Sequence, residues 1–458
     1  MKTAAAQAMF DLSQANGNGM KDPASAENRN YPVHRWVPWV AGFSRNFVDS
    51  ILLHYLPEVS GPIPLVLDPF CGVGTTLVEA MRRGYNGVGF EINPYAALAS
   101  RAKIRSFRID REALYQSIQD YETEMADVTR ELVAGNLSRL AKLKGQIPKG
   151  FKSRIPFFSE AVLWRVLATL EFASQLKIED INNMFRVALG SVMVRFSNYS
   201  YEPSLGTRPA SGKTLITEAP VDQIMASKLR DMLEDVETVQ RDFRRLLVPP
   251  QGRVCEDSFF NARQYFVSDS VDIVITSPPY LNNYHYVRNT RPQLWWLGLV
   301  QEQRDLRLVE ENNVGKYWQT VRNSETVRLS VPVPAIQHLL EEISHKNPGR
   351  GIYGGTGWAN YVATYFNDLA RFAWLLNVLL KPGCHAVVVL GNSVIQGEEV
   401  KVDRFLSEIA ALYHLDTVSS DIIRRRVGSS IVGSGLRADK ETCTAPLYDA
   451  AVVLRKPH

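Results

Sequence analysis

The sequence predicts an α/β protein with a doubly wound, seven-stranded, Rossmann-like sheet and two insertions, and three observations support this prediction. Residues 65–104 alternate strand, glycine loop, helix, strand and helix, which is the βαβ unit of a doubly wound sheet. Apolar strand patterns then return after long interruptions, near residues 253, 272, 385, 417 and 449. The last two strands have no helix between them, which favours an antiparallel pair at the end of the chain.

Two different segments precede the βαβ unit. Residues 11–30 are rich in Asn, Gly, Ser and Ala, so we expect residues 1–32 to form a flexible lead-in. Residues 33–56 are aromatic and apolar, and their second half has the spacing of a helix. That spacing is carried by Phe43, Phe47, Ile51 and Tyr55.

Each element of the βαβ unit has a local sequence signal. A first strand is expected at Leu65–Asp68, and the helix after the glycine loop should close at Gly84. A second strand is expected at Gly87–Glu91. Asn93 and Pro94 predict the start of the next helix, because Asn caps a helix and proline fits its first position.

The rest of the chain divides into sheet segments and insertions. We expect residues 33–108, 250–300 and 358–458 to form the sheet domain. Residues 109–249 read almost entirely as helix, and a polar loop is expected within them at Arg195–Lys213. A second, irregular insertion covers residues 301–357 and contains NPGRGIYGGTG. Because no strand precedes these glycines, we expect a mobile loop and not a phosphate cradle.

The C-terminal third returns to an α/β pattern. A helix is expected at Tyr361–Leu380, followed by a strand in KPGCHAVVVLGNS and a helix near Val402–Tyr413. The antiparallel strands are expected near Leu415–Ile423 and Leu447–Leu454.

The composition favours a soluble globular protein in a reducing compartment. Apolar residues make up 45% and charged residues 22% of the 458 residues. No apolar run reaches the ~20 residues of a membrane span, and the N-terminus lacks the apolar core of a secretory signal. The four cysteines are far apart, which argues against a disulfide framework and a metal site. We therefore expect a cytoplasmic protein without a metal, and the formal charge of +4 permits a polyanionic partner.

Four polar residues fall at the carboxyl ends of expected strands, where a sheet of this kind binds its ligands: Asp68, Glu91, Asp257 and Ser277. The stretch DPFCGVGTT places Gly72 and Gly74 between a strand and a helix, so the backbone can approach a ligand there. The dinucleotide fingerprint would need a third glycine at Leu77, which disfavours a pyrophosphate. A ligand that carries a carboxylate and no phosphates remains possible.

The acids narrow the choice of ligand. Glu91 lies about 20 residues past the glycine loop, where an acid accepts hydrogen bonds from ribose hydroxyls. Asp257, at the end of the third strand, can accept from an adenine amino group. Each acid alone could be a solvated surface carboxylate, but together with Asp68 they describe a pocket for adenosine with an amino-acid tail. That ligand is S-adenosylmethionine.

At this point the chain resembles the exocyclic-amino DNA methyltransferases, which make N4-methylcytosine or N6-methyladenine. VLDPFCGVGTT matches their cofactor loop and TSPPY their catalytic tetrad, in the Ser-Pro-Pro-Tyr form of the cytosine-N4 branch. HRWVPWVAGFSRNFVDSIL resembles the segment that closes over the methionine, and LKPGCHAVVVLGNS resembles a later strand. The resemblance covers roughly residues 34–104, 250–299 and 361–456. It implies cofactor contacts at Phe43, Asp68, Phe70, Cys71, Gly72, Gly74, Thr75, Thr76, Glu91 and Asp257.

The tetrad suits transfer to an exocyclic amino group. The lone pair of that nitrogen is delocalised into the base, so two acceptors at its N–H groups favour the geometry of attack. Ser277 Oγ and the Pro278 carbonyl can be these acceptors, and the rings of Pro278 and Pro279 fix their direction. Tyr280 offers a face for a flipped base, and a base in a duplex must be flipped to reach it. No Pro-Cys nucleophile of carbon-5 chemistry occurs, and Cys71 reads as a small packed residue.

Basic residues predict contacts with DNA phosphates, although a charge run is also typical of a solvated face. The expected contacts are Arg139, Lys142, Lys144, Lys149, Lys152, Arg154, Arg424, Arg425 and Arg426. The helical insertion follows the cofactor loop, as a target-recognition region does in this family.

The resemblance therefore implies a site-specific cytosine-N4 methyltransferase acting on duplex DNA with S-adenosylmethionine. It leaves open whether the protein acts alone or with restriction or phage-defence partners. Adenine N6 is the first alternative target. RNA guanine-N2 and protein-glutamine methyltransferases carry Asp or Asn before Pro-Pro, so Ser277 argues against both. A non-catalytic module that binds cofactor and DNA would not need an intact tetrad.

Overall fold

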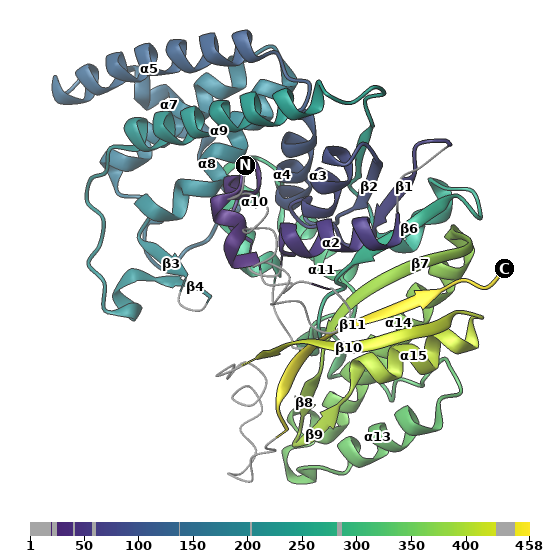
Figure 1. Cartoon of the computed structure of the whole chain (residues 1–458). Helices are drawn as coiled ribbons and strands as arrows, with labels where there is room; N and C mark the ends of the chain where they lie inside the picture. Colours follow the sequence, from purple (N-terminus) through teal and green to yellow (C-terminus); the bar gives the residue numbers. More distant parts are fainter. Residues whose placement is uncertain are drawn as a thin grey trace.

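The computed structural model describes residues 20, 25–39, 42–56, 61–136, 138–201, 204–281, 286–426 and 445–458. Its centre is one seven-stranded sheet with the strand order β10-β11-β7-β6-β1-β2-β5 (Figure 1). The predicted seven-stranded α/β sheet is therefore confirmed. Its strands are β1 (Leu65–Asp68), β2 (Asn86–Phe90), β5 (Gly252–Cys255), β6 (Val271–Thr276), β7 (Leu380–Gly391), β10 (Asp416–Arg426) and β11 (Leu447–Arg455).

Strand direction brings the two predicted motifs together. Strands β5, β2, β1, β6 and β7 run parallel, and β11 is inserted antiparallel between β7 and β10. The predicted antiparallel pair is thus confirmed. Because β6 pairs directly with β1, the tetrad after β6 and the glycine loop after β1 leave the sheet side by side at its carboxyl edge.

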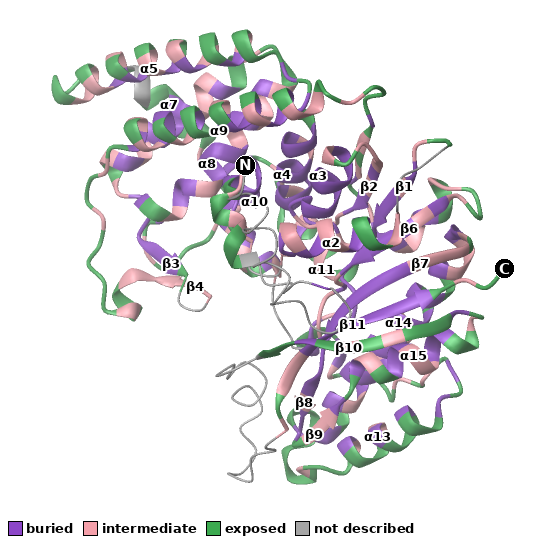
Figure 2. Ribbon diagram, in the orientation of Figure 1, coloured by how far each residue is buried: buried purple, intermediate pink, exposed green. Residues whose placement is uncertain are grey.

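Helical layers cover both faces of the sheet, and much of β7 and β11 is coloured as buried in Figure 2. Along each strand, alternate side chains point to opposite faces. Val66, Ile273 and Val387 face the layer that contains α2 (Arg45–Tyr55). Their neighbours Leu67, Val274 and Val388 face the opposite layer. That layer contains α14 (Gly355–Leu379) and α15 (Val402–Leu412). Both faces of the sheet are therefore covered, which leaves its carboxyl edge for a ligand.

The first helical layer continues into the insertion. Helix α3 (Thr75–Arg82) follows the glycine loop, and α4 (Pro94–Arg105) begins at the predicted cap, where Asn93 Oδ1 accepts from the Tyr95 and Ala96 N–H groups. The insertion leaves the sheet after α4 and returns at β5, which pairs with β2. Its helices are α5 (Arg111–Val133), α6 (Ser138–Leu143), α7 (Glu160–Gln175), α8 (Glu179–Val192) and α9 (Val221–Phe243).

One part of the insertion differs from its prediction. Where a polar loop was expected, strands β3 (Tyr199–Tyr201) and β4 (Leu205–Thr207) pair as a small antiparallel hairpin. These strands have only three residues each, so alternation along the sequence could not reveal them. They are stabilised by contacts with a distant helix, described below.

The N-terminal segment also differs from its prediction where it is described. Residues 25–30 form a 3-10 helix, so ordered structure begins before residue 33. Asn28 holds this segment against α2, because its side chain donates to the Phe43 carbonyl and accepts from the Arg45 N–H. The remainder of the expected lead-in, residues 1–19 and 21–24, lies outside the described residues.

The second insertion carries three helices: α11 (Gln303–Glu311), α12 (Trp318–Val321) and α13 (Pro334–Ser344). It follows α10 (Tyr286–Trp296) and leads into a 3-10 turn at Pro348–Tyr353.

The expected glycine-rich loop is an ordered turn and a helix start. Helix α14 begins at Gly355, six residues before its predicted start at Tyr361. A Cβ atom at Gly354 or Gly355 would overlap the carbonyl oxygens of Asn347 and Ile343. The glycines therefore allow close packing of backbone against backbone and do not provide mobility. A short hairpin of β8 (Ser393–Ile395) and β9 (Glu398–Val400), absent from the sequence prediction, follows β7.

Two features are absent from the described ranges. No helix in them is long and apolar enough to cross a bilayer. They also contain no group of three or more His, Cys, Asp or Glu side chains that could hold a metal ion.

Candidate active site

A cavity opens at the carboxyl edge of β5, β2, β1 and β6, with about 940 Å³ of empty space, part of it open to solvent. Of the expected cofactor contacts, all except Gly74 line the cavity: Phe43, Asp68, Phe70, Cys71, Gly72, Thr75, Thr76, Glu91 and Asp257. Two members of the tetrad, Ser277 and Pro279, line it as well.

The glycine loop owes its shape to two residues with positive φ. Gly72 (φ 50°) turns the chain beneath Trp39, where a Cβ would come within 3.1 Å of the indole nitrogen. Gly74 (φ 81°) precedes α3, and a Cβ there would overlap the Ser100 hydroxyl of α4. Gly74 therefore permits helix packing behind the loop, while Gly72 leaves the loop open toward the cavity.

Asp68 joins the cofactor loop to the tetrad. The Thr276 hydroxyl, at the end of β6, donates to Asp68 Oδ1 over 2.7 Å, and the Phe70 N–H donates to the same oxygen over 3.1 Å. Burial raises the pKa of Asp68 to about 6, although these two hydrogen bonds lower it. The carboxylate fixes the position of Ser277 relative to the loop.

Glu91 directly follows β2 and is half-buried at the cavity wall. Its Oε1 accepts from the Asn93 N–H over 2.7 Å. Burial raises the pKa of Glu91 to about 7; backbone donors such as Asn93 oppose this shift, and the charge of Asp68 adds to it. A carboxyl group that titrates near neutrality and faces a cavity is characteristic of a binding site.

Asp257 lies two residues after β5, on the same cavity wall. Its Oδ1 accepts from the Ser258 N–H and the Asn261 amide, and its Oδ2 accepts from the Tyr265 hydroxyl over 2.9 Å. These bonds fix the plane of the carboxylate. Since two carboxylate oxygens together have about four acceptor positions, Asp257 can still accept from a ligand amino group.

Cys71 is a packed thiol, as expected. It is buried, and burial followed by the charges of Asp68 and Glu91 raises its pKa well above the usual value. A thiol in this environment is not a nucleophile at neutral pH.

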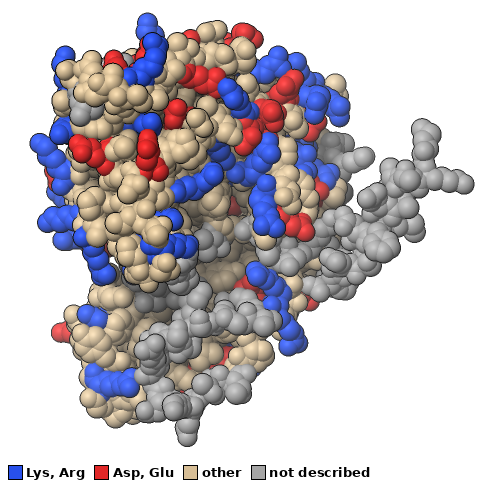
Figure 3. All heavy atoms as spheres, turned by 90° about the vertical axis from the view of Figure 1, so that its left-hand side faces the viewer, with Lys and Arg blue, Asp and Glu red and all other residues tan. Residues whose placement is uncertain are grey.

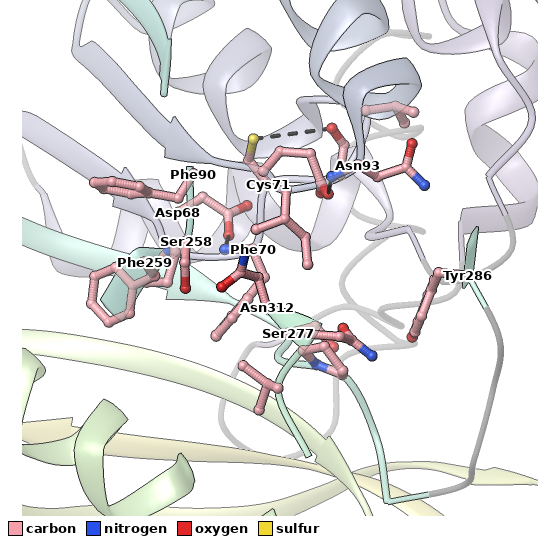
Figure 4. Close-up of a pocket in the computed structure, with 18 of the residues that line it drawn as sticks. Asp68, Phe70, Cys71, Phe90, Asn93, Ser258, Phe259, Ser277, Tyr286 and Asn312 are labelled. Atoms are coloured by element: carbon pink, nitrogen blue, oxygen red, sulfur yellow. Dashed lines mark hydrogen bonds between the residues drawn. The ribbon is translucent and has the colours of Figure 1, made fainter. Parts of the chain in front are cut away.

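The tetrad approaches the cavity from the side opposite the glycine loop. Figure 4 shows Asp68, Phe70 and Asn93 on one side, Ser277 and Tyr286 on the other, and Asn312 between them. The Ser277 hydroxyl donates to the Val389 carbonyl of β7 over 3.0 Å. Pro278 is buried and Tyr280 is half-buried, and neither lines the cavity. After the tetrad, the Leu281 carbonyl accepts from the Ser393 hydroxyl over 2.5 Å.

Several cavity residues were not expected from the sequence. Tyr286 and Val287 come from the first turn of α10. The second insertion contributes Val309 of α11 and residues 312–314 and 317 after it, which line the cavity although they carry no motif. The unexpected polar and aromatic lining residues are Trp39, Phe90, Asn93, Ser258, Phe259, Tyr286, Asn312, Asn313 and Tyr317. Asn312, Asn313 and Tyr317 lie outside the stretches that resembled a methyltransferase, so no motif pointed to them.

The basic residues expected to contact DNA are spread over several surfaces. Lys142, Lys144 and Lys149 are exposed, and the Lys144 ammonium group lies 5.2 Å from the Trp164 ring. Lys152 and Arg154 are exposed along a separate groove beside α10.

The arginines of β10 lie on another part of the surface. Arg424 and Arg425 are exposed, and Arg424 lies 3.9 Å from the Asp449 carboxylate. The side chains of Arg139 and Arg426 lie outside the described residues.

Comparison with known proteins supports the interpretation of the motifs. The family model described as DNA methylase, of N6 and N4 methyltransferases, matches residues 27–101. Type II methyltransferase M.BsoBI of Geobacillus stearothermophilus is 23% identical over 88% of this chain and 82% of its own length. Type II methyltransferase M.MvaI of Kocuria varians is 23% identical over 78% of this chain and 76% of its own. Type II methyltransferase M.AvaI of a Nostoc species is 24% identical over 84% of this chain and 79% of its own length. The resemblance of this chain to the exocyclic-amino DNA methyltransferases, predicted from its motifs, is therefore confirmed.

Proposed function

We propose that this protein transfers a methyl group from S-adenosylmethionine to an exocyclic amino group of a flipped base in duplex DNA, with cytosine N4 as the target. The observation that carries the proposal is that Ser277 and Pro279 line the same cavity as Asp68, Glu91 and Asp257. Acceptors for an amino group and acceptors for an adenosine therefore face one space.

The residues of the cavity fit the cofactor. Its ribose hydroxyls and adenine amino group are donors, and Glu91 and Asp257 offer acceptor-only carboxylates at two strand ends. The amino-acid part would lie against the open backbone at Gly72, beneath Trp39. When bound, the cofactor supplies a methyl group on a positively charged sulfur.

The hydrogen bond of Ser277 prepares it to act as an acceptor. A carbonyl oxygen can only accept, so the single hydroxyl proton of Ser277 is used in its bond to Val389. The Oγ atom can then present only lone pairs to a target amino group. An acceptor aimed in advance favours the nitrogen geometry of attack, which is worth more in the transition state than in the ground state.

The remaining members of the tetrad have complementary roles. The Pro278 carbonyl would be the second acceptor, and the two proline rings restrict the backbone around it. Tyr280 would stack on the extruded base, a contact worth ~1–3 kcal/mol. Cytosine is preferred to adenine because the tetrad begins with serine, as in the cytosine-N4 branch that it resembles.

The names of the relatives support a further part of the proposal. Three of them are Type II methyltransferases that align over most of this chain. We propose the same class here, which implies a defined recognition sequence and a cognate restriction enzyme as partner.

The decisive experiment is expression in a host that lacks DNA methylation, followed by sequencing that distinguishes N4-methylcytosine from N6-methyladenine. N4-methylcytosine at one recurring sequence would support the proposal, and N6-methyladenine would correct the target base. Single-turnover transfer of labelled methyl groups to DNA, RNA and protein is the companion measurement. Label found only in RNA or protein would refute the proposed function.

A further inference from the structure

A basic groove lies between the helical insertion and α10. It is lined by Phe151–Arg154, Tyr199, the strand Leu205–Thr207, Arg288 and Arg291. The groove has about 970 Å³ of empty space, part of it open to solvent. Four of its lining residues are cationic and none is acidic. We refer to Lys152, Arg154, Arg288 and Arg291 as the groove cations.

The charges of the groove cations are not neutralised within the described part of the chain. Lys152, Arg154 and Arg288 are exposed, Arg291 is half-buried, and none of the four forms an ion pair there. Arg291 is placed by an aromatic side chain, since its guanidinium lies 5.6 Å from the Phe151 ring centroid. Four positive charges around one concave surface create a strong potential for a polyanion.

Hydrogen bonds between the two walls of the groove fix its shape. The Tyr201 hydroxyl of β3 donates to the Asn289 carbonyl over 2.8 Å, and the Leu205 N–H of β4 donates to Asn289 Oδ1 over 3.1 Å. The Arg154 N–H donates to the Tyr199 hydroxyl over 2.9 Å. The hairpin is thus anchored to α10 between the two arginines of that helix.

The groove lies next to the cavity of the active site. Tyr286 and Val287 line the cavity, and the next residue of α10, Arg288, lines the groove. Successive Cα atoms are only 3.8 Å apart, so a phosphate held by Arg288 would belong to the strand close to the extruded base. Figure 3 shows Lys and Arg side chains around a hollow between the upper and lower halves of the molecule.

We propose that the groove cations bind the phosphate backbone of duplex DNA beside the target base, with the β3–β4 hairpin as the adjoining wall of the DNA site. This inference rests on the proposed function. Phosphate contacts set the register of a protein on DNA without reading its sequence. The groove would therefore hold the strand while the cavity receives the base.

The test measures how the affinity for a short random-sequence duplex depends on salt, by fluorescence anisotropy from about 50 to 200 mM NaCl. Two double variants are compared with wild type: Arg288→Gln with Arg291→Gln, and Lys152→Gln with Arg154→Gln. Each should weaken binding and make the slope of log K against log salt shallower by up to about 1.8, or about 0.9 for each lost phosphate contact. Both residues of the second pair are exposed, so this variant remains informative if loss of the half-buried Arg291 disturbs folding.

The matched control removes two charges far from the groove. Arg244 and Arg245 are exposed and without ion pairs in the described chain, at the far end of α9, whose 23 residues span about 34 Å. Arg244→Gln with Arg245→Gln should leave the slope near that of wild type. Affinity for S-adenosylmethionine should stay unchanged in all three variants.

Each result decides one point. An unchanged slope in both groove variants, or an equal loss in the control, would refute the groove as a phosphate site. Equal effects on duplex RNA of the same length would refute its assignment to DNA. Absence of methyl transfer by wild type, with normal DNA binding and altered slopes, would refute the proposed function and leave the groove assignment standing.

Discussion

Cofactor affinity should rise with pH between 6 and 8, because Glu91 must be ionised to accept from the ribose. In the free protein, burial raises the pKa of Glu91 to about 7, although hydrogen bonds from backbone N–H groups lower it. Roughly half of the molecules therefore carry a protonated Glu91 at pH 7. Two ribose hydroxyls would stabilise the carboxylate, so the pKa in the complex should be lower and binding should release protons.

The size of the effect follows from the ionised fraction. That fraction is about one tenth at pH 6 and about nine tenths at pH 8 for a pKa of about 7. If only the ionised form binds, affinity should rise about 10-fold over this range, which equals ~1.4 kcal/mol. Glu91→Gln cannot ionise, so its affinity should be lower at pH 8 and should lack this part of the pH dependence.

The assay is isothermal titration calorimetry of S-adenosylmethionine at pH 6, 7 and 8, for wild type and Glu91→Gln. The variant accounts for ionisation of the ligand itself, so the difference between the two curves reports Glu91. At pH 7, two buffers with different ionisation enthalpies should show release of about half a proton by wild type. Identical pH curves for wild type and variant would refute the role assigned to Glu91.

Three further predictions concern the tetrad and the core. Ser277→Ala should lower kcat by at least about 10-fold in single-turnover transfer with unchanged cofactor affinity, since its bond counts mainly in the transition state; an effect on KM alone would contradict this. Tyr280→Ala should lower transfer about 10-fold through loss of ~1.4 kcal/mol of stacking, and equal rates on duplex DNA in both proteins would contradict it. Lys103 is 1% exposed, and burial, with the charge of Lys228, lowers its pKa to about 7. Its charged form is disfavoured only in the folded state, so Lys103→Met should raise the free energy of unfolding. The increase should be largest at or below pH 7, at most roughly 5 kcal/mol, and smallest near pH 10.5, as followed by thermal unfolding at each pH. If the stability gained by Lys103→Met does not become smaller as the pH rises, the buried charge of Lys103 is not its cause.

The parts of the fold that were predictable carry their signals locally. The strand before Asp68, the glycine loop and the Asn93 cap each occupy a few consecutive residues whose backbone preferences agree with the structure. The order of these signals was enough to bring Asp68, Glu91, Asp257 and Ser277 to one edge of the sheet.

The parts that were missed depend on contacts between distant segments. The β3–β4 hairpin is too short to show alternation, and it is stabilised by Asn289, more than 80 residues away along the chain. The glycines before α14 resembled a flexible loop because their composition does not reveal which carbonyl groups they approach. Asn312 and Asn313 carry no motif and reach the cavity only through the path of the second insertion.

The attachment of the hairpin to α10 limits how such a protein can be recombined. The insertion leaves and re-enters the sheet at neighbouring strands, β2 and β5, which would make it a convenient unit to exchange. Its hairpin, however, shares hydrogen bonds with Asn289 in the helix that follows the tetrad. A chimera that replaces residues 109–249 alone would leave the donor hairpin facing a foreign helix. A new specificity should therefore be moved together with residues 286–296, the helix that adjoins the catalytic cavity and shares these hydrogen bonds with the hairpin.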